Sequence, residues 1–205
     1  QVGMFDGRRF HLVQFIGPVK PEWREALAQT GVRVLHYLPH NAFLVRGDAT
    51  SLAALQTWAR SSAFVQWDGA YADSYKLHPN ARTTDDKGKP QEPDVDTFVV
   101  QWVEDAEANP ATLALMEQLR IEPVERQFEA LNYVNMIVRL PRSRLNVLAA
   151  RPDVVFIQSY PERRKMDERQ NQILAGNLVG IVPGAPGYLA WLAEKGFTQA
   201  QFTAS

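Results

Sequence analysis

Phe10–Phe15 reads FHLVQF, and the chain returns to this pattern at Thr97–Trp102, which reads TFVVQW. Three further pairs of segments recur in the same order. They are Asn41–Arg46 with Asn135–Arg139, Leu52–Leu55 with Leu145–Leu148, and Val65–Tyr71 with Val154–Tyr160. Self-similarity that keeps its order along the chain is the signature of a duplicated structural unit. The sequence therefore predicts two copies of one domain.

Each copy predicts the element order strand, helix, strand, strand, helix, strand. Strands are expected where β-branched and aromatic residues gather, and helices where proline or acidic residues precede an apolar stripe. In the first copy these segments are Arg8–Gly17, Pro21–Ala28, Val32–Leu38, Ala42–Gly47, Ser51–Arg60 and a last strand from Val65. In the second copy, Asn109-Pro110 opens one helix and Pro141 opens the other.

This order is that of the ferredoxin-like fold. We predict an α+β protein of two tandem ferredoxin-like βαββαβ domains, each a four-stranded antiparallel sheet with two helices on one face. The predicted boundaries are 1–77 for the first copy and 95–166 for the second. Residues 78–94 contain several prolines and almost no apolar side chains, which predicts a linker, and residues 167–205 are a separate arm.

The bulk composition argues against several functional classes. The net charge is −1, with lysine and arginine scattered, so we expect no nucleic-acid partner. No apolar run is long enough to span a bilayer, and we expect no membrane partner. Cysteine is absent. His36 and His40 are four residues apart, but Pro39 between them predicts a strand and turn, so we expect no metal site. No hydrolase motif or phosphate loop is visible, and we expect no cofactor.

Several predicted strands are apolar on both faces, whereas a sheet covered on one side should alternate. Exposed apolar surface on a small domain usually marks an interaction site. The candidates for such a docking face are Phe43, Val45, Trp67, Ile137 and Phe156. The alternatives are that the two copies bury these faces against each other, or that the chain forms a homodimer.

The residues of the first copy resemble a known family. The run from Phe10 to Arg46, with Gly17-Pro18 and Trp23 inside it, resembles the propeptide of bacterial subtilisin-like serine proteases. Trp67–Leu77 looks like the tail segment of long, multi-repeat members of that group. Asp167–Leu174 is similar to the arm that opens the catalytic domain, and Gly187–Phe197 resembles a segment just before the strand that bears the catalytic Asp.

The resemblance implies an inhibitor and intramolecular folding chaperone rather than an enzyme, because the catalytic triad would follow this region. The implied partner is the catalytic domain of its own protease, and the implied location is secreted or periplasmic in a bacterium, with the signal peptide already removed. Family propeptides lay a C-terminal tail in the substrate cleft. The tail candidates are Tyr71, Tyr75, Lys76 and Leu77 after the first copy, or Tyr160 and Pro161 after the second.

Two other functional classes remain open from the sequence. Regulatory domains that bind small molecules such as amino acids share the βαββαβ order. A purely structural accessory module that sets assembly or dimerisation is the third interpretation.

Overall fold

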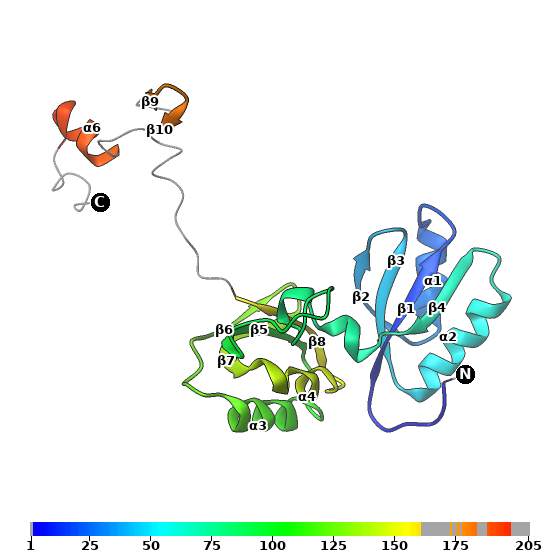
Figure 1. Cartoon of the computed structure of the whole chain (residues 1–205). Helices are drawn as coiled ribbons and strands as arrows, with labels where there is room; N and C mark the ends of the chain where they lie inside the picture. Colours follow the sequence, from blue (N-terminus) through cyan, green and yellow to red (C-terminus); the bar gives the residue numbers. More distant parts are fainter. Residues whose placement is uncertain (1, 161–172, 174–175, 177, 184–187, 198–205) are drawn as a thin grey trace. The chain divides into compact units, whose positions relative to one another are not determined.

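Two four-stranded antiparallel sheets organise the part of the chain between Arg9 and Ser159 (Figure 1). The computed structural model describes residues 2–160, 173, 176, 178–183 and 188–197. Residues 1–160 form one compact unit and residues 161–205 form a second. The predicted α+β fold of two tandem ferredoxin-like domains is confirmed.

Repeat 1, which we define as Arg9–Ala70, builds sheet 1 with the strand order β2-β3-β1-β4. Its elements are β1 (Arg9–Phe15), α1 (Pro21–Gln29), β2 (Arg33–Leu38), β3 (Ala42–Gly47), α2 (Ala49–Ser61) and β4 (Val65–Ala70). Leu27 of α1 and Leu55 of α2 share one buried cluster with Val13, Phe15 and Val45 of the sheet. Both helices therefore cover the same face of sheet 1.

Helix α2 begins two residues before the predicted start because of its cap. The Asp48 carboxylate accepts hydrogen bonds from the Ser51 backbone N–H and the Ser51 hydroxyl, both at 2.8 Å. An aspartate at this position satisfies one of the free N–H groups of the first helical turn. The pKa of Asp48 is lowered by these hydrogen bonds.

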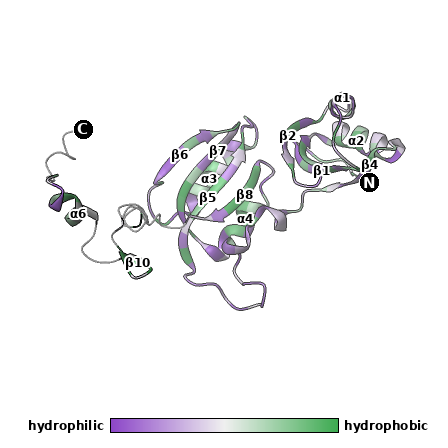
Figure 2. Ribbon diagram, turned by 90° about the horizontal axis from the view of Figure 1, so that it is seen from above, coloured by the Kyte–Doolittle hydropathy of each residue, from purple (hydrophilic) through white to green (hydrophobic). Residues whose placement is uncertain are grey.

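Repeat 2, which we define as Val95–Ser159, builds sheet 2 with the order β6-β7-β5-β8. Its elements are β5 (Val95–Val103), α3 (Asn109–Leu119), β6 (Arg126–Ala130), β7 (Tyr133–Pro141), α4 (Leu145–Ala149) and β8 (Val154–Ser159). Phe98, Val100 and Trp102 of β5 pack with Met116 of α3 and Leu148 of α4, so this pair of helices also covers one face. Much of β5 and β8 is coloured hydrophobic in Figure 2.

The second helix of repeat 2 is shorter than predicted. Strand β7 continues to Pro141, a 3-10 turn η3 (Arg142–Arg144) follows, and α4 begins only at Leu145. The Arg142 side chain is 4% exposed and points inward to main-chain carbonyls. The burial of this arginine just before α4 was not visible in the sequence pattern.

In each repeat, the turn between the second and third strands in chain order (β2 and β3, β6 and β7) has a left-handed backbone. His40 and Asn41 have φ angles of 64° and 59°, and Leu131 and Asn132 have 52° and 69°. Ala130 pairs with Tyr133, so Leu131 and Asn132 form a two-residue turn, in which the favoured type needs positive φ at both positions. Asparagine tolerates this conformation, while leucine does not favour it.

The described residues beyond Tyr160 include a short pair of strands and one helix. They are β9 (Leu178–Val179), β10 (Val182–Pro183) and α6 (Tyr188–Glu194). Of the predicted arm Asp167–Leu174, only Ile173 lies within the described residues.

Candidate functional site: two sheet faces and the joint between the repeats

The face of sheet 1 that its helices leave uncovered is occupied by repeat 2. Side chains alternate along a strand, so Phe10 and Leu44 point away from the helices that Val13 and Val45 contact. Phe10 and Leu44 are 5% and 1% exposed. They form a cluster with Val103, Tyr133 and Val155 of repeat 2. We call this contact between the repeats the joint. Burial of the two copies against each other therefore takes place at this face.

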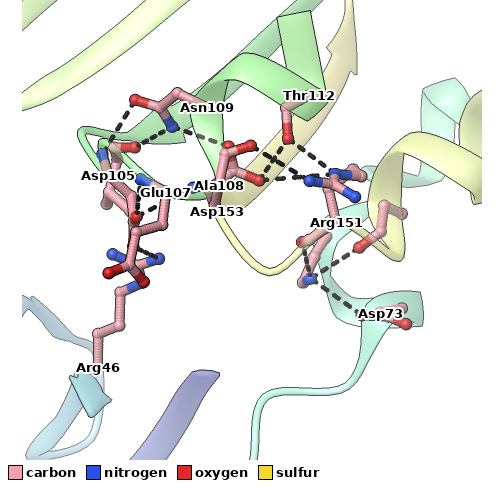
Figure 3. A network of polar contacts seen from close by, with 12 residues as sticks. Arg46, Asp73, Asp105, Glu107, Ala108, Asn109, Thr112, Arg151 and Asp153 are labelled. Atoms are coloured by element: carbon pink, nitrogen blue, oxygen red, sulfur yellow. Dashed lines mark hydrogen bonds and ion pairs between the residues drawn. The ribbon is translucent and has the colours of Figure 1, made fainter. Parts of the chain in front are cut away.

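A buried ion pair crosses the joint. Arg46 of β3 donates from Nη2 to Asp105 Oδ2 at 2.6 Å, and both side chains are at most 4% exposed. Asp105 also accepts the N–H groups of Glu107 and Ala108 just before α3 (Figure 3). Burial opposes ionisation of Asp105, but the hydrogen bonds from Ala108 and Arg46 outweigh it and hold the pKa of this carboxyl below its usual 3.8. Asp105 is therefore an ionised partner for Arg46.

A second polar contact of the joint pairs His36 of β2 with Tyr133 of β7. His36 Nδ1 meets the Tyr133 hydroxyl, and the two rings lie edge to face with centroids 5.7 Å apart. Burial lowers the pKa of His36 below its usual 6.5 and raises the pKa of Tyr133 to about 12. At neutral pH both side chains are therefore uncharged, which suits a contact beside an apolar cluster.

Between α3 and the start of β8, repeat 2 contains a buried polar network around Asp153 (Figure 3). Asp153 is fully buried and accepts hydrogen bonds from Thr112 Oγ1 at 2.6 Å and Asn109 Nδ2 at 2.8 Å. Arg151 Nε donates to Thr112 Oγ1 at 2.8 Å. Because the polar atoms of this network are paired within repeat 2, they lock α3 to the start of β8 rather than offer a reactive group.

The tail candidates of the first copy lie between the repeats. Tyr71 donates from its hydroxyl to the Val155 carbonyl at 3.3 Å, and burial raises its pKa to about 12. Lys76 and Leu77 are 3% and 7% exposed against repeat 2. Only Tyr75, at 55%, is exposed, with its ring 6.0 Å from that of Tyr71. In this arrangement Lys76 and Leu77 are not available to a protease cleft.

The tail candidates of the second copy lie where the chain leaves sheet 2. The Tyr160 N–H donates to the Thr97 carbonyl at 2.8 Å, so Tyr160 still follows the course of β8. Pro161 lies outside the described residues.

The docking candidates divide between the two faces of their sheets. Phe43 and Val45 belong to the core beneath α1 and α2, so they do not lie on the uncovered face. The run Phe43–Val45 is apolar at every position, and the pattern could not show that Leu44 is the residue on the other side. Trp67 pairs with Gln14 on the uncovered face and is 48% exposed.

On sheet 2, Ile137 and Phe156 lie on the face opposite the helices. Ile137 pairs with Val99 and Phe156 with Gln101, whereas their strand neighbours Val138 and Ile157 are in the core. Ile137 is 4% exposed, and Phe156 is half-buried, because it packs against the cluster of the joint and its ring lies 5.9 Å from that of His78. Val99, Gln101 and Phe128 on this face are also half-buried.

Among the residues that the structure describes, no cluster of three or more His, Asp or Glu side chains could hold a metal ion. Within the same residues, no helix has the length and apolar character needed to cross a membrane.

Comparison with known proteins gives limited information. A family model described as a domain of unknown function (DUF8729) matches residues 2–72, less than half of the chain. No curated protein matches. Among solved structures, the acetolactate synthase small subunit from Thermotoga maritima matches with 13% identity over 76% of this chain and 99% of that chain, with a TM-score of 0.22. A similarity at this TM-score does not bear on function.

Sequence reasoning missed the polar residues of the joint. The position of Arg46, directly after the apolar run Phe43–Val45, was a usable signal. An arginine next to a buried strand segment is rarely buried itself unless it has a charged partner. Nothing in the sequence indicated that its partner would be Asp105.

Proposed function

We propose that this region binds the catalytic domain of a subtilisin-like serine protease, inhibits it and assists its folding, and that repeat 2 carries the docking surface. The resemblance of Phe10–Arg46 and Trp67–Leu77 to propeptide sequences supports the family. The uncovered face of sheet 2 supports the choice of repeat.

The observation that carries this choice is the difference between the two uncovered faces. On sheet 1, Phe10 and Leu44 are already buried by repeat 2, and Trp67 on the edge strand β4 is the large side chain left exposed, at 48%. On sheet 2, Val103 and Tyr133 at one end of the corresponding face lie in the joint and Phe156 packs against them, but Val99 and Phe128 keep part of their apolar surface exposed. A partner that covered this surface would gain about 25 cal/mol for each Å² of apolar area removed from water.

The exit of the chain supports the same repeat. Tyr160 directly follows β8, the strand that also contributes Phe156 to the uncovered face. A tail that continues from Tyr160 would reach its site while the face is docked, so the second contact would be intramolecular. Such a tail would bind by strand addition, in which main-chain hydrogen bonds give affinity.

A preformed surface of this kind also accounts for a chaperone role. Proteins dominated by non-local contacts fold slowly because loop closure must precede the contacts that reward it. A sheet face that binds two parts of a folding partner together would reduce this cost.

The test compares two matched variants of the whole chain. Phe128→Asp places a charge on the part of the sheet 2 face that lies outside the joint, and Trp67→Asp places one on sheet 1. We expect the first to weaken inhibition of the protease at least tenfold and the second to leave it unchanged, with both variants folded by circular dichroism. Equal inhibition by both variants and the unaltered chain would contradict the assignment to repeat 2.

Two other measurements, made beside the inhibition assay, distinguish the other functional classes. A metabolite of an amino-acid panel that raises the melting temperature, without any protease binding, would favour a small-molecule-binding module. A dimeric mass in solution without inhibition would favour a structural one.

A further inference from the structure

Strand β8 is an edge strand of sheet 2, yet its outer side is occupied. It pairs with β5 on one side. On the other side, Leu77 forms a parallel bridge with Ile157, and the His78 N–H donates to the Ile157 carbonyl at 2.9 Å. Ser159 donates from its N–H to Asn80 Oδ1 at 3.2 Å and from its hydroxyl to the Asn80 carbonyl at 2.8 Å. Residues that follow repeat 1 therefore cover the exposed edge of repeat 2.

The same segment completes the core of repeat 2. It comprises η1 (Asp73–Lys76) and η2 (Pro79–Ala81), and we call residues 73–82 the strap. Leu77 and Ala81 are 7% and 1% exposed and belong to the cluster that contains Phe98 and Ile157. Two buried apolar side chains of the strap thus count among the core residues of the domain that follows them.

Lys76 ties the strap to the end of α4. Its Nζ donates to the Ala149 carbonyl at 2.7 Å and to the Arg151 carbonyl at 2.9 Å, and pairs with Asp73 at 2.9 Å. The last carbonyls of a helix have no partner within the helix, and a cation there is also favoured by the helix dipole. Burial lowers the pKa of Lys76, and the Asp73 carboxylate partly offsets this.

Arg142 holds the other end of the strap from the side of repeat 2. Its guanidinium, 4% exposed, donates to the carbonyls of Asn80 and Arg82 and pairs with Asp96 at 3.3 Å. Both ends of the strap are therefore fixed by buried cations, one on the strap and one on repeat 2.

We propose that repeat 1 and the strap act as a cis clamp on repeat 2: the strap completes the fold of repeat 2 and fixes the point at which the chain leaves β8. The interaction surface is the outer edge of β8 with the end of α4, and its partner is the strap of the same chain. The second half of the proposal rests on the proposed function, in which Tyr160, directly after Ser159, begins the inhibitory tail.

One consequence concerns the division of labour. While Lys76 holds the end of α4 and Leu77 pairs with β8, they cannot enter a substrate cleft. Repeat 1 is then not a second inhibitor; it keeps the inhibitory repeat folded in the absence of the protease.

Hydrogen exchange of the full chain tests the clamp without any protease, so its outcome is independent of the proposed function. We expect Leu77→Ala to accelerate exchange of the β8 amides about thirtyfold or more, as the loss of a core leucine should. Exchange in β1 and β3 should not change. Tyr75→Ala, at the exposed strap residue, is the matched control and should leave β8 as it is. Unchanged β8 protection in Leu77→Ala would overturn the proposal.

Two further measurements keep the test decisive if Leu77→Ala unfolds. Asn80→Ala removes only the side-chain contact to Ser159 and should accelerate exchange of that amide alone. A protease recognition sequence placed in the exposed loop at residues 84–90 allows the full chain to be cut after folding. The two pieces should stay together in gel filtration, and their separation would contradict the clamp.

Discussion

The ion pair between Arg46 and Asp105 allows the joint to be tested by a single substitution. Arg46→Met keeps the length of the side chain but leaves the Asp105 carboxylate, 3% exposed, without its closest cation. Removal of one member of a buried pair typically costs about 3–5 kcal/mol of stability. Two features of the site reduce this figure. Asp105 retains the N–H groups of Glu107 and Ala108, and Arg8 lies 3.6 Å away.

Arg46 itself also carries an uncompensated burial cost. Its Nε makes no hydrogen bond within the described residues, so a methionine recovers part of what the pair contributes. We therefore expect Arg46→Met to lower the free energy of unfolding by about 2–3 kcal/mol. Arg46→Met combined with Asp105→Asn should cost less than the sum of the two single changes, by at least about 1 kcal/mol, because the residues are in contact.

The assay is urea denaturation followed by circular dichroism. The control is Arg139→Met, which breaks the pair with Glu122 whose side chains are 43% and 55% exposed. Exposed pairs contribute about 0–1 kcal/mol, so the control should be nearly neutral. If Arg46→Met costs no more than Arg139→Met, or if the double change is additive, the joint is not held by this pair and the reasoning fails.

Three other changes follow from particular contacts. Thr112→Val removes a hydrogen bond to the fully buried Asp153 and should cost about 1.5–3 kcal/mol in the same denaturation assay; a neutral result would mean that the network does not constrain α3. Leu131→Asn relieves a left-handed leucine that is 89% exposed and should raise stability by about 0.5–1 kcal/mol, whereas a lower melting temperature would show that Leu131 makes a contact that matters. Burial lowers the pKa of His36, so the folded protein binds this proton less tightly than the unfolded chain. The folded protein is favoured while His36 is neutral, so this contribution to the free energy of unfolding is complete above about pH 6.5. It should be lost as the pH drops below that value, because the unfolded chain then binds the proton more tightly. In His36→Gln, the melting temperature should fall less steeply between pH 6.5 and lower pH than in the unaltered chain. Parallel plots of melting temperature against pH for the two proteins would exclude His36 as the source.

The duplication was predictable because it rests on short-range patterns that packing did not override. Pro21 at the start of α1 and the apolar positions Leu27, Leu52 and Leu55 specify amphipathic helices with one buried face. The left-handed turn at His40-Asn41 joins two strands at the predicted place. These features need only the local sequence.

Features that depend on contacts distant in sequence were not predictable. Residues 78–94 look like a linker and Lys76 like part of a tail because the segment is hydrophilic, yet Lys76 and Asn80 form hydrogen bonds with Ala149 and Ser159 of repeat 2. The sequence also could not show on which face of sheet 1 Phe43 and Val45 lie, since a strand that is apolar at every position has no alternating pattern. Burial on both sides of sheet 1 explains why the strand carries no such signal.

Inhibition of a subtilisin-like catalytic domain is the function proposed for this chain. The most direct test is titration of the full chain, and of Phe128→Asp, against the subtilisin-like catalytic domain that the resemblance of Asp167–Leu174 would imply, with peptide hydrolysis as the readout. The account predicts stoichiometric, slowly reversed inhibition by the unaltered chain, faster refolding of the denatured catalytic domain in its presence, and a loss of both in the variant. Undiminished hydrolysis at a molar excess of folded chain, with no complex in gel filtration, would contradict it.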